Sequence, residues 1–264
     1  MAYESFIYEI DDGIGTVRLN DPGKLNALTF KTYEELERLM RESADDDKVK
    51  VVVLTGEGKG FCSGGSVNEI IAKLVDMKGD SLYRFTRMTS DVVKNMRNLK
   101  KPIIAAVNGM AAGAGAMLAL ASDFRIASVH ARFAFLFARV GLSGADMGAL
   151  HLLPRIVGQG RATELLFLGD AIDAQEAWRI GLANRVVRHE DLMKEVYALA
   201  QRLKESPRYA LGVTKQLLNR EMQMDLDAAL EMEARAQAIC METADFREGY
   251  RAIVEKRAPT FNRS

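Results

Sequence analysis

Two short runs of strand-forming residues, each followed by a glycine-rich turn, constrain the fold of this chain most strongly. Residues 49–55 read VKVVVLT and residues 102–108 read PIIAAVN. Apolar, β-branched runs of this length are typical of strands buried on both faces of a sheet. The glycine-rich segments GEGKGFCSGGS (56–66) and GMAAGAGA (109–116) follow them. Recurrence of strand, loop and helix predicts an α/β fold with mainly parallel strands.

The elements around these strands agree with this fold class. Alternation of apolar and polar residues on both sides of Asp12-Gly13 is typical of a hairpin, and amphipathic periodicity is typical of surface helices. The expected elements are a β-hairpin over residues 5–20, a helix that Thr29 caps and that extends to Glu42, a helix over Asp80–Met96 and a third buried strand over Phe124–Ser128.

The pattern turns helical after residue 173. Residues 174–187 predict a helix and a short strand, whereas residues 189–256 predict amphipathic helices with almost no strand signal. We therefore place a boundary near residue 200. The expected organisation is an α/β core over residues 1–200 and a helical region over residues 201–264.

Composition excludes several classes of protein. The chain carries 36 Lys and Arg against 36 Asp and Glu, so it lacks the basic excess that nucleic-acid binding requires. No apolar run reaches the roughly 20 residues of a membrane span, and the N-terminus resembles no signal peptide. Cys62 and Cys240 lie far apart, and the histidines and cysteines form no metal-ligand pattern. These features predict a cytoplasmic protein without a bound metal.

The two glycine-rich loops carry the chemical argument. Ser63–Ser66 and Gly113–Ala116 each follow a strand, and the second loop opens directly into a helix, where backbone N–H groups are free. Two such loops on neighbouring strands can aim two N–H donors at one oxygen. Each donor of an oxyanion hole contributes about 3–4 kcal/mol to transition-state stabilisation.

Other interpretations of the loops remain open from the bare pattern. Glycine-rich turns often serve only close packing between backbones. A dinucleotide site is disfavoured because Leu118 replaces the third glycine of that motif and no acidic ribose partner is evident. A nucleophile elbow is disfavoured because neither Ser63 nor Ser143 lies in a G-x-S-x-G motif.

Several blocks of the sequence, in order, resemble the crotonase (enoyl-CoA hydratase/isomerase) superfamily. They are NDPGKLNALT, GKGFCSGGS, KPIIAAVNGMAAGAGAMLALASDFRIAS, ARFAFLFARVGL, LLPRIVGQGRATELLFLGDAIDAQEAWRIGLANRVV and TADFREGYRAIVEKRAP. The resemblance covers nearly the whole chain. It implies a spiral of ββα units followed by a helical C-terminal region that forms trimers, and in many members hexamers built as dimers of trimers.

The resemblance also implies a ligand and the residues that hold it. The oxyanion donors would be the backbone N–H groups of Ser63 and Ala114. No cofactor would be bound permanently, because coenzyme A enters as part of an acyl-CoA substrate. The residues expected to contact CoA are Lys24, Leu25, Ala27, Ser63, Gly65, Ser66 and, from a neighbouring subunit, Lys256, whose charge is equally compatible with simple solvation.

Three positions depart from the pattern of the superfamily. Hydratases of this kind use two glutamates to handle a water molecule, and here Met117 and Phe137 occupy those positions. Ser66 replaces an aspartate beside the CoA site. Because general acid–base catalysis normally contributes about 10²–10⁴-fold in rate, the two-glutamate mechanism is not available to this chain.

Asp146, in the turn GLSGADMGA, is the best remaining acid or base. Several branches of the superfamily place a catalytic aspartate in this turn, among them dienoyl-CoA isomerases, ring-modifying isomerases, dihydroxynaphthoyl-CoA synthases and aromatic-CoA dehalogenases. The register allows an offset of one residue. An alternative role for Asp146 is the N-cap of the following helix.

An apolar, aromatic wall is expected around the acyl group, and burial among such neighbours would raise the pKa of Asp146. The wall would contain Met117, Phe135, Leu136, Phe137 and Met147, each of which is equally compatible with ordinary core packing. Other polar residues are weaker candidates: His151, Tyr83, Arg84 and Arg87 near the acyl group, His130 and His189 as solvated side chains, and Cys62 as a packed thiol.

Together with the resemblance, the sequence therefore predicts an acyl-CoA enzyme that stabilises a thioester enolate and acts as a hydratase or isomerase on an unsaturated acyl group, a class that includes cyclic and aromatic-derived groups. Two alternatives stay open. In the first alternative, the chain is a homologue that binds acyl-CoA without catalysis. In the second, it is a CoA-thioester hydrolase or decarboxylase that uses the same oxyanion hole.

Overall fold

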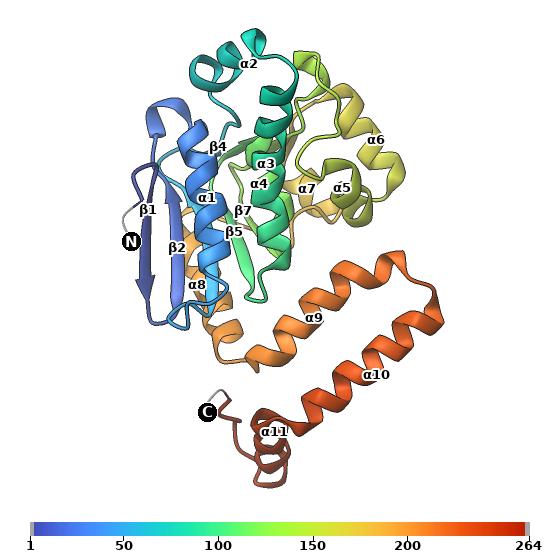
Figure 1. Cartoon of the computed structure of the whole chain (residues 1–264). Helices are drawn as coiled ribbons and strands as arrows, with labels where there is room; N and C mark the ends of the chain where they lie inside the picture. The colour runs from blue at the N-terminus through green and yellow to red at the C-terminus, as the bar shows by residue number, and fades with distance from the viewer. Residues whose placement is uncertain (1–2, 262–264) are drawn as a thin grey trace.

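The structure is a computed structural model that describes residues 3–261 (Figure 1). Its strands form a six-stranded sheet, in the order β1-β2-β3-β5-β7-β10, and a four-stranded sheet, in the order β4-β6-β8-β9. The larger sheet contains β1 (Phe6–Asp11), β2 (Ile14–Leu19), β3 (Val51–Gly56), β5 (Ile103–Val107), β7 (Phe124–Ser128) and β10 (Arg185–Val187). The smaller sheet contains β4 (Gly60–Cys62), β6 (Met110–Ala112), β8 (Arg132–Ala134) and β9 (Ile172–Asp173).

Each turn of the chain adds one strand to each sheet. β3, β5 and β7 enter the larger sheet, and the strand that follows each of them, β4, β6 or β8, enters the smaller sheet. After the β1–β2 hairpin, all pairings in the larger sheet are parallel. The predicted α/β class and the spiral of repeated ββα units are confirmed.

The helices surround both sheets (Figure 1). The α-helices are α1 (Phe30–Glu42), α2 (Ala72–Asp76), α3 (Asp80–Asn98), α4 (Ala114–Ala121), α5 (Ala149–Val157), α6 (Gln159–Leu168), α7 (Ala174–Arg179), α8 (Leu192–Lys204), α9 (Arg208–Arg220), α10 (Leu226–Glu242) and α11 (Ala244–Val254). The short helices are η1 (Pro22–Lys24), η2 (Val67–Ile71), η3 (Ala138–Val140), η4 (His189–Asp191) and η5 (Glu221–Gln223).

Local sequence signals account for the first elements. Asp12 and Gly13 both have positive φ angles, 44° and 80°, as a two-residue hairpin turn requires. Thr29 caps α1 through a reciprocal pair of hydrogen bonds with Thr32. The predicted hairpin and helices are confirmed, and α3 continues two residues beyond the predicted end at Met96.

Alternate side chains of the buried strands enter two separate apolar clusters. Val52 and Leu54 of β3 belong to the large cluster beneath α1 and α3, whereas Val51 and Val53 belong to a smaller cluster. Helix α8 covers the smaller cluster with Leu192, Val196 and Ala200. Burial on both faces explains why residues 51–54 are continuously apolar rather than alternating.

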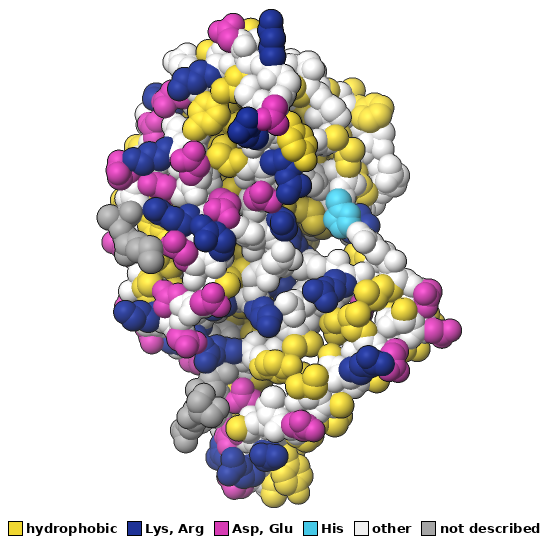
Figure 2. Space-filling view, viewed as in Figure 1, with side chains coloured by type: hydrophobic (Ala, Val, Ile, Leu, Met, Phe, Trp, Pro, Cys, Tyr) yellow, Lys and Arg dark blue, Asp and Glu magenta, His cyan; other side chains and the backbone are white. Residues whose placement is uncertain are grey.

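The last three helices, α9 to α11, form what we term the C-terminal arm, which extends away from the sheets (Figure 1). Along residues 205–261 the structure contains helices and no strand, in agreement with the helical pattern of the sequence. Helix α10 has no buried residue. Apolar side chains gather on the surface of the arm (Figure 2). The domain boundary near residue 200 stays a prediction.

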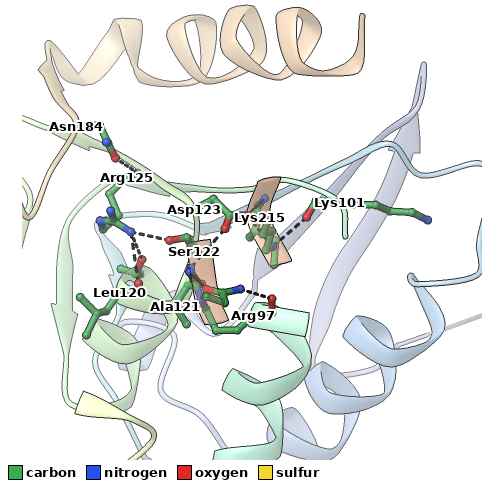
Figure 3. A network of polar contacts seen from close by, with 12 residues as sticks. Arg97, Lys101, Leu120, Ala121, Ser122, Asp123, Arg125, Asn184 and Lys215 are labelled. Carbon is green, nitrogen blue, oxygen red and sulfur yellow. Dashed lines mark hydrogen bonds and ion pairs between the residues drawn. The ribbon is translucent and has the colours of Figure 1, made fainter. Parts of the chain in front are cut away.

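A buried polar network fastens α9 to the sheets (Figure 3). The Nζ atom of Lys215 lies 2.7 Å from Oδ2 of Asp123 and donates to the carbonyl of Lys101 at 3.1 Å. Asp123 also accepts from the backbone N–H of Ile103 at 2.8 Å and pairs with Arg97 at 3.4 Å. Burial lowers the pKa of Lys215, and the charge of Asp123 opposes that change. The pair therefore holds the root of the arm.

Lys215→Met should lower the free energy of unfolding by about 3 kcal/mol, because a buried carboxylate loses its closest cation. Thermal unfolding followed by circular dichroism measures the change. Arg188→Met is the matched control: Arg188 pairs with Asp191 at the surface, where such a pair contributes less than about 1 kcal/mol. A Lys215→Met protein that melts with the control would contradict this role for the network.

Candidate active site

The two loops predicted to contact CoA lie side by side and are joined by main-chain hydrogen bonds. The Leu28 N–H donates to the Gly64 carbonyl at 2.7 Å, and the Ser66 N–H donates to the Leu28 carbonyl at 2.8 Å. The Ser63 N–H donates to the Leu25 carbonyl at 2.9 Å. The loops therefore form one rigid surface, although they are almost forty residues apart in the sequence.

Two buried asparagines hold this surface in place. Asn26 donates through its side-chain amide to the carbonyls of Glu57 and Gly60, at 2.9 and 2.8 Å. Asn108 donates to three carbonyls in the same turn, including that of Gly60 at 3.0 Å. Sequence reasoning assigned neither residue a role. The feature of the sequence that could have identified them is an asparagine in a polar loop at a position that becomes buried, because one side-chain amide can hydrogen-bond to several backbone carbonyls there.

The glycines let the two loops touch backbone to backbone. A Cβ atom on Gly115 would lie 2.0 Å from the carbonyl oxygen of Cys62, so no side chain fits there. Gly64 has φ +98° and faces the other loop, where its Cβ would lie 2.9 Å from the Ala112 oxygen and 3.5 Å from the Ala114 nitrogen. The close-packing role that the bare pattern left open is therefore confirmed for Gly64 and Gly115.

The hydrogen bonds decide which N–H groups are free. The Ser63 N–H is bound to Leu25, which argues against its predicted role as an oxyanion donor because that hydrogen already has an acceptor. Leu28 and Gly65 form a parallel β-bridge, and its two hydrogen bonds use the Gly64 carbonyl and the Ser66 N–H. The Gly65 N–H, which lies between these groups in the chain, has no acceptor among the described residues. Ala114 is the first residue of α4, and its N–H is equally free.

The other residues predicted to bind CoA fall into two places. Lys24 is exposed, and its Nζ atom lies 3.6 Å from Oδ2 of Asp21 and 3.5 Å from Oε1 of Glu69. The Ser66 hydroxyl accepts from the Glu69 N–H and caps η2, so the serine at this position acts locally as a helix cap. Lys256 follows α11, at the far end of the arm in Figure 1, and does not meet the loops within one chain.

Asp146 lies in a strained turn. The next two residues, Met147 and Gly148, both have positive φ angles, 45° and 83°. Left-handed backbone is costly for a residue with a side chain, and such strain gathers at functional sites. The first helical residue of α5 is Ala149, and its N-cap is Gly148 without any side-chain cap. The alternative that Asp146 is the N-cap is therefore wrong.

The environment of the Asp146 carboxylate favours its protonated form. Burial raises its pKa, and the hydrogen bond from the Met147 N–H acts in the opposite direction. A raised pKa brings a carboxylate closer to the neutral range in which proton transfer is efficient. The predicted direction of the shift is confirmed.

Four of the five residues predicted to form the acyl wall lie in one apolar cluster. Met117, Phe135, Phe137 and Met147 are all buried members of the large cluster. Leu136 is partly exposed and lies outside it. Neither Met117 nor Phe137 has a group that transfers a proton, so the two-glutamate site is absent in the structure as in the sequence.

Of the weaker candidates, Cys62 is a buried member of this cluster, whereas the histidines and Arg84 lie outside it. His151 is exposed on α5, and His130 and His189 are exposed with ring centroids 5.4 Å apart. Arg84 pairs with Asp80 at the surface of α3. Burial raises the pKa of the Cys62 thiol to about 12, so this residue stays a neutral part of the packing.

Residues 3–261 contain no group of three His, Cys, Asp or Glu side chains that could hold a metal. No helix within the same residues is both long and apolar enough to span a membrane.

Comparison with known proteins settles the family. The family model for enoyl-CoA hydratase/isomerase matches residues 9–264. The chain belongs to this family. A crotonyl-CoA hydratase from Syntrophomonas wolfei is 37% identical over 262 residues, which cover 99% of each protein. A 1,2-epoxyphenylacetyl-CoA isomerase from Escherichia coli K12 is 36% identical and covers 98% of each.

Solved structures agree with this assignment. A candidate enoyl-CoA hydratase from Streptomyces coelicolor A3(2) is 49% identical, with a TM-score of 0.96 and coverage of 99% of this chain and 95% of that one. An enoyl-CoA hydratase/isomerase from Cupriavidus metallidurans CH34 is 32% identical, with a TM-score of 0.92 and coverage of 100% and 99%. The resemblance to the crotonase superfamily is confirmed.

The raised pKa of Asp146 predicts how one substitution changes stability with pH. The folded state disfavours the ionised carboxylate, so this group costs stability once the pH exceeds its folded pKa and costs nothing below its unfolded pKa. Asp146→Asn should therefore melt higher than the wild type at neutral pH, and the difference should vanish in acid. Thermal melts across the pH range measure it.

Asp47→Asn is the control for this experiment, because the Asp47 side chain is 98% exposed. Its melting temperature should follow that of the wild type throughout. An Asp146→Asn protein that is less stable than the wild type at neutral pH would contradict the inferred cost of the buried charge.

Proposed function

We propose that this protein binds an acyl-CoA and stabilises its thioester enolate on the backbone N–H groups of Gly65 and Ala114. The observation that best supports this proposal is the pattern of hydrogen bonds. Among the described residues these two N–H groups have no acceptor, and they lie on loops in backbone contact, whereas the Ser63 N–H already donates to Leu25. Gly65 replaces Ser63 in the predicted pair. Because the donors are main-chain atoms, Ala114 serves as well as glycine.

Asp146 is the proposed acid and base. Its carboxylate takes a proton from the α-carbon of the acyl group, and the electron pair left behind moves to the thioester oxygen, which the two N–H groups hold. Asp146 then returns the proton to the α-carbon or to a carbon conjugated with it. The raised pKa, the strained turn and the inert side chains of Met117 and Phe137 support this assignment.

The acyl group is proposed to be unsaturated and bulky, a class that includes cyclic groups and groups derived from an aromatic ring. A wall that contains Phe135 and Phe137 favours such a group. The relative named 1,2-epoxyphenylacetyl-CoA isomerase supports this, whereas the relative named crotonyl-CoA hydratase supports a short chain. Coenzyme A would enter with the substrate, along the surface formed by Lys24, Leu25 and Ala27, whereas Ser66 is buried and caps η2.

Exchange of substrate protons with D₂O tests the proposal before the natural reaction is known. Mass spectrometry should show that the wild type incorporates deuterium into phenylacetyl-CoA or 3-hexenoyl-CoA. Asp146→Asn should slow exchange by about 10²-fold or more. Ala114→Pro should slow it by about 10²–10³-fold, because proline removes the N–H yet fits the first position of a helix.

Ala244→Pro is the matched control, since Ala244 is the first residue of α11, and exchange should be unaffected. Binding of these thioesters without exchange would identify a non-catalytic acyl-CoA-binding protein. Release of free CoA, detected as a thiol, would identify a hydrolase. Either result would overturn the proposed proton transfer.

The C-terminal arm is proposed to assemble the protein into trimers or hexamers. A groove of about 420 Å³ lies between α9, α10 and α11, and its lining includes Tyr209, Phe246, Tyr250 and Ile253. An apolar groove of this kind, beside a helix α10 that has no buried residue, favours a second copy as its cover. Assembly is also what would bring Lys256 near the CoA surface of a neighbour.

Light scattering on the eluted protein should give a mass of three or six chains. Ile253→Asp should shift the protein toward monomers, because a charge in an apolar interface is costly to desolvate. The control is Val75→Asp on α2, with a side chain as exposed as that of Ile253, at 78% against 79%. A stable wild-type monomer at micromolar concentration would contradict assembly through the arm.

A further inference from the structure

Helix α4, whose first residue is the proposed donor Ala114, carries no polar side chain. It reads AGAMLALA over Ala114–Ala121, and all of its residues are buried. The hydrophobic effect that buries such a helix has no preferred direction. Hydrogen bonds that fix the position of α4 along its own axis therefore have to come from the backbone groups at its two ends.

The N-terminal end of α4 has few such bonds. The N–H of Gly113, the residue before the helix, donates to the Ala134 carbonyl at 2.9 Å. Within the helix itself no side chain caps the first turn, and the Ala114 N–H has no acceptor among the described residues. The proposed reaction requires this N–H to stay available to the substrate, so a protein bond cannot anchor it.

The C-terminal end is the opposite. The regular pattern of an α-helix leaves its last four carbonyls without a donor, and in α4 each of them accepts a hydrogen bond from a group beyond the helix. Ser122, which follows the helix, supplies two of these bonds. Its hydroxyl donates to the Leu118 carbonyl at 2.9 Å, and its N–H donates to the Ala119 carbonyl at 3.2 Å.

Arg125 of β7 is the main side-chain donor to this end of α4 (Figure 3). It is 6% exposed. Its Nη1 donates to the carbonyls of Ser122 and Leu120, at 2.6 and 3.4 Å, and its Nε donates to the Leu182 carbonyl at 2.6 Å. Burial lowers its pKa to about 10, and the charge of Asp123 opposes that change. The guanidinium therefore stays charged at neutral pH, where it complements the negative end of the helix dipole.

Arg97, near the end of α3, reaches the same end of α4 from another element. Its Nη1 donates to the Ala121 carbonyl at 3.3 Å, and its Nε donates to Oδ1 of Asn219 on α9 at 3.0 Å. We term Arg97, Ser122 and Arg125 the α4 clamp. The clamp connects the C-terminal end of α4 to α3, to β7 and to the root of the C-terminal arm.

We propose that the α4 clamp positions the Ala114 N–H, so that Arg125 and Arg97 are positioning residues of the oxyanion hole. Because α4 has only eight residues, a shift at its C-terminal end also moves the N–H at its first residue. Misplacement by about 1 Å can cost about 10²-fold in rate. This inference rests on the proposed function, because it takes the Ala114 N–H as a donor to the enolate.

A double-mutant cycle tests whether Arg125 acts through Ala114, with proton exchange of phenylacetyl-CoA in D₂O as the readout. Arg125→Lys keeps the charge, but one ammonium group cannot replace the donors to Leu182 and to α4 together. It should lower the maximum exchange rate about 10-fold or more and leave KM within about 2-fold, because the clamp acts on the enolate rather than on the bound thioester. In the Ala114→Pro background the same substitution should change the rate by less than about 2-fold, since the N–H that it positions is gone.

Glu35→Gln is the matched control. Glu35 is as buried as Arg125, at 7% against 6% exposure, and it accepts from the Ser5 N–H at 2.9 Å instead of holding α4. Its exchange rate should equal that of the wild type. Arg97→Lys repeats the cycle on the second arginine of the clamp and decides the question if Arg125→Lys does not fold. Circular dichroism checks that each variant is folded at the assay temperature.

The outcomes separate this inference from the proposed function. If Arg125→Lys exchanges like the wild type, or if its effect and that of Ala114→Pro simply add, the positioning role is overturned and the proposed function stands. A loss in Glu35→Gln as large as that in Arg125→Lys would reveal a general loosening of the fold, which also overturns the positioning role. Exchange that Ala114→Pro leaves unchanged would remove the donor itself, and both proposals would fail.

Discussion

The proposed site depends on one contact between two backbone segments of the chain, at Gly115 and the carbonyl of Cys62. A side chain at residue 115 would separate β4 from α4 and so disturb the two loops that carry the proposed donors, the N–H groups of Gly65 and Ala114. The spiral supplies this contact, because parallel strands of the smaller sheet place successive loops at the same edge. Catalytic geometry is in this sense a product of sheet topology.

The proposed site combines a rigid part, held by satisfied hydrogen bonds, with a part that lowers the stability of the fold. Asn26 and Asn108 satisfy the turn beneath the loops almost completely, so the donors need no reorganisation during a reaction. Asp146 is the opposite, because burial disfavours the ionised form of its carboxylate. Polar groups left in this condition reduce stability, and a ligand that pairs with them recovers that free energy as binding.

Much of the fold was predictable from the sequence, because local patterns specify strands, caps and turns. The strand 49–55, the Asp12-Gly13 turn and the Thr29 cap follow from residue type alone. The sequence could not show whether the N–H of Ser63 or that of Gly65 is free. This depends on the hydrogen bond that the Ser63 N–H makes to Leu25, a residue distant in the sequence.

Main-chain donors also shape how such a protein changes over generations. Among single substitutions, proline alone removes an N–H, so the charge-stabilising part of the site survives most mutations at positions 65 and 114. The side chains of Met117 and Phe137 pack in the core and supply none of these donors, so the proposed hole does not depend on them. The group that carries the proton can therefore come from a different loop, as we propose for Asp146.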